Sequence, residues 1–230
     1  MTQICTIAAR NYLAHVRVLA RSFLRHHPGG SCSVFLIDDP DGLEANDDEP
    51  FTQVTLSQIG IAEDEYLRMA TIYDVTELAT AVKPWVLRAA INGGHPAAFL
   101  DPDIEFHAAI DEVNGLANRE GIVLTPHTLH PMKRDGLLPS EMEILRAGIY
   151  NLGFIVVGAS GAAFLDWWAE RLARDCIVDP GAGLHVDQRW VDFAPGYFNT
   201  YILRDPGYNV AYWNVDQRQL AWTGDRKSVV

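Results

Sequence analysis

The sequence has few cysteines, few basic residues and no long apolar run, and each shortage excludes a class of protein. Its three cysteines, Cys5, Cys32 and Cys176, are odd in number and lack metal-ligand spacing, which indicates buried free thiols rather than a disulfide framework. Lys and Arg number 18 against 30 Asp and Glu, and the net charge of -12 argues against nucleic acid as a partner. No stretch reaches the roughly 18 uninterrupted apolar residues of a membrane-spanning helix. These features predict a cytoplasmic protein without a transmembrane segment.

What the chain does contain is enough apolar sequence for a sizeable core. It has 230 residues, of which 48% are hydrophobic, so we predict a single domain over residues 1–230. The hydrophobic periodicity predicts strands at 4–9, 33–37, from 97, at 122–125 and at 151–157, with helices at 12–25, over most of 63–92, at 110–118 and at 160–174. This alternation predicts an α/β domain with a mixed, mostly parallel sheet and helices on both faces.

Three further expectations concern local features. Ser160 is a good N-cap for the helix that follows it, and the stripe that includes Trp167 and Trp168 on that helix predicts core packing. The polar segment 129–145 contains two prolines and a glycine, which predicts a loop placed to cover a site.

The most informative motif is Asp101-Pro102-Asp103, which follows the buried run from Ala97 to Leu100. Carboxylates at positions i and i+2 of a turned or extended segment project the same way, so they can share one divalent cation, and that cation can also bind a diphosphate. An ordinary Asp-Pro-Asp turn is the alternative. The position at the carboxyl end of a predicted strand favours a ligand site.

Two more short segments follow in a fixed order, Asn151-Leu152-Gly153 and Asp187-Gln188. With Asp-X-Asp first, Asn-X-Gly second and Asp-Gln third, the chain resembles metal-dependent glycosyltransferases of the GT-A fold, most nearly the family 8-like group. The resemblance covers roughly residues 1 to 218. It implies a Rossmann-like GT-A domain that transfers a sugar from a nucleoside-diphosphate sugar, with a UDP-sugar favoured, to a hydroxyl acceptor. It also suggests retention of the anomeric configuration.

The resemblance implies a donor site and a metal site. Asp101 and Asp103 would ligate Mn²⁺ or Mg²⁺, which would stabilise the leaving nucleotide as a Lewis acid. The residues implied on the donor side are Ala8, Ala9, Arg10, Asn11, Tyr12, Asp38, Lys83, Asp101 and Gly153. For Lys83, a solvated helix cation is an equally compatible interpretation.

The catalytic residues implied by the resemblance are Asn151, Asp187 and Gln188. An amide suits sugar hydroxyls because it both donates and accepts, and a carboxylate can hold hydroxyls or stabilise oxocarbenium character. The alternatives are an ordinary Asn before Gly for Asn151 and a helix N-terminus for the Asp-Gln pair. An inverting enzyme would instead need a base, for which Asp187, Asp192 and Glu105 stay open.

The chain departs from the family pattern at the third metal ligand. Related enzymes commonly supply a His from a C-terminal segment, and no histidine follows Trp213 here. Either a C-terminal segment is lacking, or His127 or His185 completes the site, or carboxylates, phosphate and water suffice, which suits Mg²⁺. His107 and His130 are weaker candidates.

Three other functions compete with the transferase. A non-catalytic sugar-nucleotide-binding module would keep the fold without turnover. A phosphohydrolase of the haloacid dehalogenase type would place Asp-X-Asp after its first strand, whereas three predicted strands precede it here. A nucleotidyltransferase would need a glycine-rich loop after the first strand, and residues 8–12 contain no glycine. For a transferase, we expect a glycan, lipid-linked or small hydroxyl acceptor, and peripheral contact with the inner membrane face is compatible with this.

Overall fold

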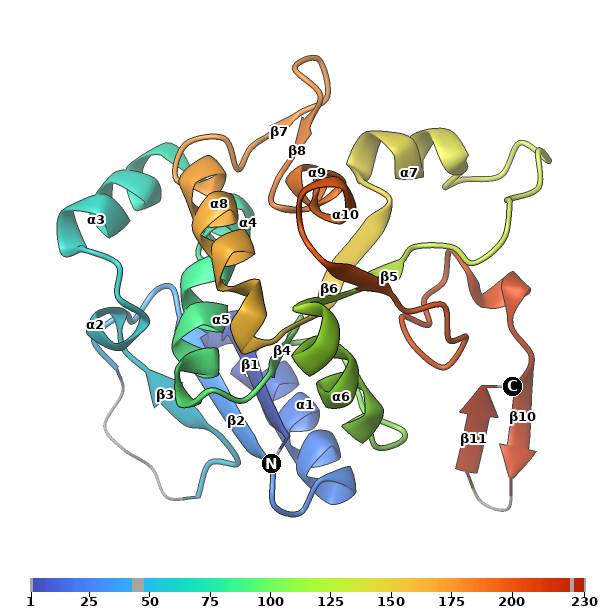
Figure 1. Cartoon of the computed structure of the whole chain (residues 1–230), viewed down its shortest axis with the longest axis horizontal. Helices are drawn as coiled ribbons and strands as arrows, with labels where there is room; N and C mark the ends of the chain where they lie inside the picture. The colour runs from blue at the N-terminus through green and yellow to red at the C-terminus, as the bar shows by residue number, and fades with distance from the viewer. Residues whose placement is uncertain (1, 43–47, 224–225, 230) are drawn as a thin grey trace.

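The computed structural model describes residues 2–42, 48–223 and 226–229 and is built around a seven-stranded sheet (Figure 1). The strands are β1 (Gln3–Ala8), β2 (Ser31–Leu36), β3 (Thr52–Val54), β4 (Ala97–Leu100), β5 (Ile122–Pro126), β6 (Tyr150–Val157) and β9 (Thr200–Ile202). Their order is β3-β2-β1-β4-β6-β5-β9, and β6 alone among them runs antiparallel to its neighbours. The mixed, mostly parallel sheet predicted from the sequence is confirmed. Two short hairpins pair β7 (Val178–Asp179) with β8 (Leu184–His185) and β10 (Leu220–Thr223) with β11 (Arg226–Val229).

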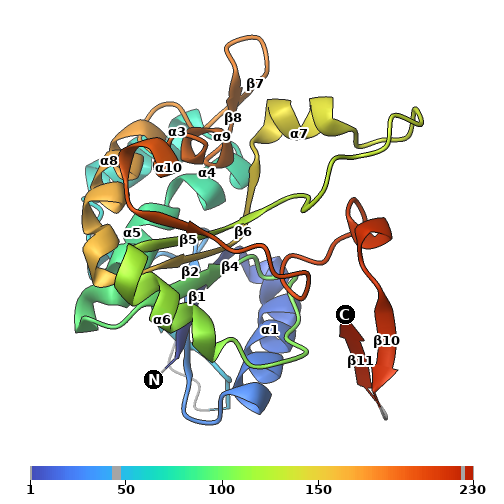
Figure 2. The ribbon, with the colours of Figure 1, turned by 45° about the vertical axis from the view of Figure 1, so that its right-hand side comes forward.

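Helices cover both faces of this sheet, as predicted (Figure 2). They are α1 (Leu13–His26), α2 (Leu56–Ile59), α3 (Glu63–Ile72), α4 (Val75–Ala81), α5 (Lys83–Ala90), α6 (Asp111–Glu120), α7 (Glu141–Ala147), α8 (Ala162–Leu172), α9 (Gln188–Val191) and α10 (Ala194–Tyr197). Alternate residues of each central strand face opposite layers, so that Phe99 of β4 packs with α5 and α8 while Leu100 packs with α1 and α6. The sheet therefore separates two apolar cores.

Local sequence signals explain where several helices begin. The predicted helical segment 63–92 divides into α3, α4 and α5, because Asp74 forms a capping box with Glu77 and Pro84 lies in the first turn of α5. The predicted loop 129–145 is not a loop throughout, because Ser140 caps α7.

The region around α8 corrects one expectation and confirms another. Ser160 lies inside a 3₁₀ turn (Ala159–Gly161) and does not cap α8, which begins at Ala162. Of the two tryptophans, Trp168 is fully buried and Trp167 is half-buried against the core. All three cysteines are free and buried, as predicted. Within the described residues, the helices are too short or too polar to cross a bilayer.

The topology fixes where a ligand site belongs. From β1 the chain moves outward to β2 and β3 on one side, and then returns to place β4 on the other side of β1. The strand order thus reverses between β1 and β4, and ligands of open α/β sheets bind at the carboxyl ends of the strands at such a point. The residues that follow β1 and β4 are the 3₁₀ turn Arg10–Tyr12 and the Asp101 motif.

Candidate functional site

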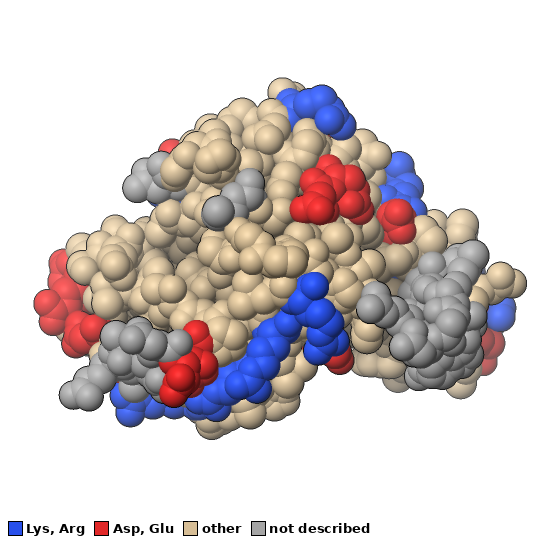
Figure 3. Space-filling view, turned by 90° about the horizontal axis from the view of Figure 1, so that it is seen from below, with Lys and Arg blue, Asp and Glu red and all other residues tan. Residues whose placement is uncertain are grey.

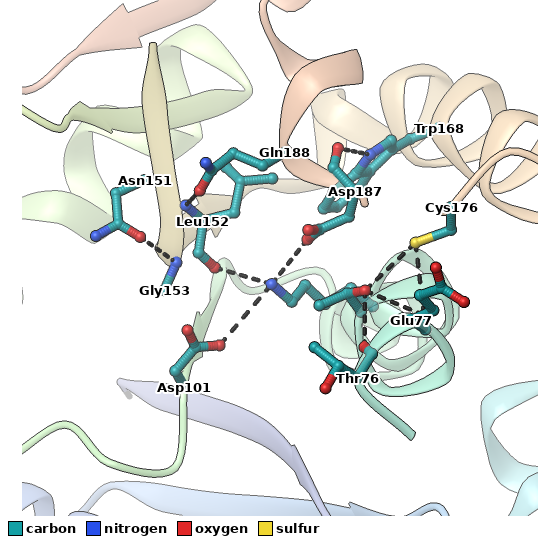
Figure 4. A network of polar contacts seen from close by, with 12 residues as sticks. Thr76, Glu77, Asp101, Asn151, Leu152, Gly153, Trp168, Cys176, Asp187 and Gln188 are labelled. Carbon is teal, nitrogen blue, oxygen red and sulfur yellow. Dashed lines mark hydrogen bonds and ion pairs between the residues drawn. The ribbon is translucent and has the colours of Figure 1, made fainter. Parts of the chain in front are cut away.

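Lys83 lies among the polar residues that gather beyond β4, and Figure 4 labels its partners Asp101, Leu152 and Asp187. Its side chain is only 3% exposed, and its Nζ lies 2.7 Å from Asp187 Oδ2 and 3.8 Å from Asp101 Oδ1. The ammonium also donates a hydrogen bond to the Leu152 carbonyl at 3.1 Å. We call these four residues the Lys83 centre. The interpretation of Lys83 as a solvated helix cation is wrong, because its side chain is buried and its ammonium pairs with the buried Asp187 carboxylate.

The charges of the Lys83 centre do not balance. Burial lowers the pKa of Lys83, but the Asp187 and Asp101 carboxylates outweigh that effect and raise its pKa above the usual value. Burial raises the pKa of Asp187, an effect that Lys83 opposes. Burial also raises the pKa of Asp101 to about 6, with Lys83 opposing and the charges of Asp187 and Asp103 adding to the rise. The site holds more negative charge than one ammonium neutralises, so a bound cation would relieve repulsion there.

The backbone that leads into Asp187 is strained, and hydrogen bonds on either side hold it. The preceding residue, Val186, has a φ of 41°, a left-handed conformation that a β-branched side chain rarely adopts. Its amide donates to the Ile177 carbonyl at 3.0 Å, and the Asp187 carbonyl accepts from Trp168 Nε1 at 3.1 Å. Sequence reasoning assigned Trp168 to the core alone and gave no signal for Val186.

Gly153 makes room for the Asp101 carboxylate. The Asp101 amide donates to the Gly153 carbonyl at 2.9 Å across the pair β4 and β6. A Cβ at position 153 would lie 3.0 Å from Asp101 Oδ2 and 3.1 Å from Asn151 Oδ1, closer than real Cβ atoms normally approach. The glycine of the Asn-X-Gly segment therefore allows the Asp101 carboxylate to approach β6 closely. Asp103 follows two residues further along the same turn and is exposed.

Asn151 uses its side-chain amide within the protein. Its Oδ1 accepts from the Gly153 amide at 2.8 Å, and its Nδ2 donates to Asn209 Oδ1 at 2.6 Å. Asn209 has a left-handed φ of 53° and donates in turn to the Pro126 carbonyl at 2.9 Å. These contacts fix the entrance of β6 next to Asp101. The direct role of Asn151 toward sugar hydroxyls stays a prediction.

Gln188 is engaged in a similar way. Its Oε1 accepts from the Leu152 amide at 3.2 Å and its Nε2 donates to the Ala147 carbonyl at 3.0 Å. Gly148, with a φ of 120°, approaches the Gln188 backbone so closely that a Cβ would lie 3.1 Å from its carbonyl oxygen. Gln188 therefore joins the end of α7 to the start of β6. Its placement beside a reacting carbon stays a prediction.

The residues expected near the nucleoside come together at the ends of β1 and β2. Both carboxylate oxygens of Asp38 accept from the Arg10 amide, at 3.0 and 3.1 Å, and the Arg10 guanidinium pairs with Asp39 at 2.7 Å. Ala8 is buried, whereas Asn11 and Tyr12 are exposed. The loop 8–12 and Asp38 therefore lie side by side, and their contact with a nucleoside stays a prediction.

The histidines do not complete a metal site around Asp101. Within the described residues, no three His, Cys, Asp or Glu side chains cluster as metal ligands. His127 is buried, its Nδ1 lies 3.1 Å from the Ile149 carbonyl, and burial lowers its pKa. Two carboxylates nevertheless fit Mg²⁺ or Mn²⁺, because these hard cations accept oxygen ligands and often take the rest from substrate phosphate and water. The acidic excess of the Lys83 centre favours the same conclusion.

A segment that sequence reasoning left unassigned, 203–218, supports this edge of the sheet. Asn214 is fully buried and donates to the carbonyls of His127 and Asn209, at 2.7 and 2.8 Å. Trp213 Nε1 donates to the same His127 carbonyl at 3.2 Å. Single Asn and Trp residues in an irregular segment carry no periodic signal, so these contacts were not predicted.

The candidate bases differ in their freedom to act. Asp192 accepts from the Ile149 amide at 2.8 Å and pairs with Arg189, whereas Glu105 is exposed. Asp187 is 2% exposed and paired with Lys83. The structure thus brings Asp187 and Asp101 together, and it ties Asp192 to the start of β6.

Comparison with known proteins identifies the fold class. A scan against protein families finds no match. The uncharacterized protein YfnF of Bacillus subtilis (strain 168) is 26% identical over 235 residues, which is 96% of this chain and 75% of YfnF. The solved structures that are similar to this chain include two glycosyltransferases. The WbbM bifunctional glycosyltransferase has a TM-score of 0.52 and 11% identity, over 88% of this chain and 38% of that one. A glycosyltransferase involved in glycosylation of the major capsid of PBCV-1 has a TM-score of 0.50 and 10% identity, over 89% and 82%. The chain therefore has the GT-A fold of these glycosyltransferases, as its motifs predicted.

Proposed function

We propose that this protein is a glycosyltransferase that moves a sugar from a nucleoside-diphosphate sugar to a hydroxyl acceptor with the help of a divalent cation. The observation that supports this most is the Lys83 centre, where Asp101 and Asp187 converge on one buried ammonium at the carboxyl end of β4. In a GT-A fold this is the edge at which the strand order reverses and a nucleotide is expected.

Asp101 and Asp103 are the proposed ligands of Mn²⁺ or Mg²⁺. When bound, the cation would offset the charge of the donor diphosphate and assist departure of the nucleotide as a Lewis acid. An acidic chain needs such local compensation to bind a diphosphate, since its net charge is -12. We favour UDP as the nucleotide and retention of configuration, both from the resemblance in the motifs.

Lys83 acts as a positioning residue in this proposal. Its ammonium donates to the Leu152 carbonyl and pairs with Asp187 at 2.7 Å, and the Asp101 carboxylate lies 3.8 Å away. It therefore fixes the relative placement of the metal-binding carboxylate and of Asp187. Asp187 would then hold sugar hydroxyls or stabilise positive charge near the transferred carbon.

One alternative has specific support. Both ends of the Asn151 and Gln188 amides are satisfied within the protein, which is what a non-catalytic sugar-nucleotide-binding module would also show. A phosphohydrolase is less well supported, because its nucleophile would be Asp101, which here follows the fourth strand of the chain and lies beside Lys83.

The first experiment is calorimetric titration of UDP into the protein with and without Mn²⁺, for wild type and for Asp103→Asn. Asp103 is exposed, so its substitution is expected to leave folding intact while removing one proposed ligand. We expect UDP binding that requires Mn²⁺ and weakens about 10-fold or more in the variant, since loss of even an outer-shell partner of a metal ligand costs about 10–100-fold. Asp64→Asn, at an exposed aspartate of α3, is the matched control and should bind as wild type does.

A turnover assay then separates the two candidate functions. Release of UDP from UDP-sugars, with transfer to simple glycosides, would support the transferase. Binding that requires Mn²⁺ without any release or transfer would favour the binding module. Absence of binding to both UDP and GDP in either condition would contradict the proposed donor site.

A further inference from the structure

A segment between β5 and β6 carries apolar side chains into solvent. We call residues 129–149 the arm; it extends away from the sheet and returns through α7 (Figures 1 and 2). Leu137 and Leu138, next to each other in its loop, are 72% and 77% exposed, and Met142 and Leu145 on α7 are 54% and 51% exposed. Scattered apolar residues on a surface are ordinary, but four in one short projecting segment indicate an interaction surface.

The arm also carries unpaired positive charge. Lys133 and Arg134 precede the two leucines and are exposed, and within the described residues neither forms an ion pair. The net charge of -12 is not spread evenly over the protein, since Figure 3 shows Lys and Arg in a band and Asp and Glu in separate groups on one face. The exposed carboxylates of the arm, Asp135 and Glu141, each accept a hydrogen bond from an amide of the arm, whereas Lys133 and Arg134 form no such contact within the described residues.

The polar backbone of the arm is partly satisfied from within. Asp135 accepts from the Leu137 amide at 3.0 Å, and Glu141 accepts from the Met132 amide at 3.1 Å. Ser140 and Glu143 complete a capping box at the start of α7. The amides of Met132 and Leu137 therefore keep a partner when water leaves the loop, which removes their share of the cost of insertion.

We propose that the arm docks the protein on an anionic lipid surface, with Leu137 and Leu138 inserted at the interface and Lys133 and Arg134 contacting headgroups. Burial of aliphatic side chains at the acyl boundary is favourable, and each basic residue near an anionic leaflet adds electrostatic attraction. Aliphatic residues next to unpaired cations fit this partner better than an uncharged protein surface, which would leave both cations without a counterion. The proposal concerns an interaction surface and does not rest on the proposed sugar transfer.

Flotation with lipid vesicles tests the proposal. We expect binding to vesicles of phosphatidylcholine with about 30% phosphatidylglycerol, and weaker binding to phosphatidylcholine alone. Leu137→Ser/Leu138→Ser should reduce binding about 10-fold, and Lys133→Gln/Arg134→Gln should remove the preference for anionic lipid. The matched control is Leu67→Ser/Val75→Ser, which removes two apolar side chains that are 57% and 67% exposed on α3 and α4. This control should float as wild type does.

Site-specific labelling gives an independent readout. The three native cysteines are all buried, so a thiol-reactive NBD dye would label the single exposed cysteine of a Leu138→Cys variant. We expect its emission to shift to the blue when vesicles are added, and the same dye on Val75→Cys to remain unchanged.

Three results would overturn the proposal. The first is flotation that the leucine substitutions do not change. The second is a dimer in sedimentation velocity that Leu137→Ser/Leu138→Ser dissociates, which would make the arm an interface between copies. The third is a blue shift at position 138 on addition of UDP and Mn²⁺ without vesicles, which would make the arm a lid.

Discussion

The Lys83 centre and the arm are neighbours at one end of the sheet, but they differ in burial and in the source of their contacts. The Lys83 centre takes its residues from α5, β6 and the segments after β4 and before α9, and Lys83 and Asp187 are 3% and 2% exposed. The arm takes its hydrogen bonds mainly from its own residues, and its leucines lie in solvent. Function at the centre is thus coupled to the stability of the whole protein, whereas function at the arm depends on local surface chemistry.

This difference predicts which substitutions will change the stability of the fold and which will change only a surface interaction. A buried ion pair is itself weak evidence for stability, because desolvation offsets much of its attraction, yet breaking it leaves an unpaired charge in the core. An exposed leucine contributes little to folding because it is solvated in both states. The two regions should consequently respond very differently to changes of similar size.

The largest effect is expected for Lys83→Met. The variant leaves Asp187 buried without its ammonium, and breaking such a pair costs about 3–5 kcal/mol of unfolding free energy. Urea denaturation measures this, with Leu137→Ser/Leu138→Ser as the contrast, for which we expect a change within about 0.5 kcal/mol. The double variant Lys83→Met/Asp187→Leu should recover most of the loss, because it removes both charges. Equal destabilisation in the single and double variants would show that lost packing, not the unpaired carboxylate, is responsible.

A smaller effect is expected for Gly153→Ala. The new Cβ would lie 3.0 Å from Asp101 Oδ2, so the carboxylate or β6 must shift, at a cost of about 1–3 kcal/mol. Displacing a metal-binding carboxylate should also weaken Mn²⁺-dependent UDP binding about 10-fold. Gly29→Ala, at a position where a Cβ meets nothing within 4 Å, is the control and should change neither quantity. Unchanged binding in Gly153→Ala would show that the position of Asp101 is not critical.

The fold was more predictable than the site. Strands such as 151–157 and the helix at 12–25 follow from periodic apolar residues and from Gly and Pro at their ends, which are local signals. The error at Ser160 arose because a good capping residue competes with a 3₁₀ turn, and tertiary packing decided the outcome. Helix α7 was missed because it is only seven residues long and follows a segment rich in Pro and Gly, which favours a loop.

Within the site, the motif residues were predicted and their contacts were not. The Asp101 and Asp187 carboxylates could be named from the order of short motifs. The burial of Lys83 could not be predicted, because it depends on an ion pair with Asp187, which lies 104 positions further along the sequence. Val186 is strained only because its surroundings hold it, and nothing in its own residue type indicates a left-handed backbone. Long-range geometry of this kind leaves no periodic trace.

The smallest effect is expected for protonation of His127, which precedes the arm and contacts the carbonyl of its last residue, Ile149. Burial lowers the pKa of His127, and nearby His185 acts in the same direction, so the folded protein favours the neutral ring. The unfolded chain binds a proton near the usual imidazole pKa of about 6.5, and therefore stability should fall as pH drops through that value and continue to fall until the lower folded pKa is passed. Hydrogen exchange of the Ile149 amide, which donates to Asp192, would show this as faster local opening at pH 5.5 than at pH 7.5. His127→Gln removes the titrating group and should flatten the difference, while an equal difference in that variant would assign the pH dependence to other residues.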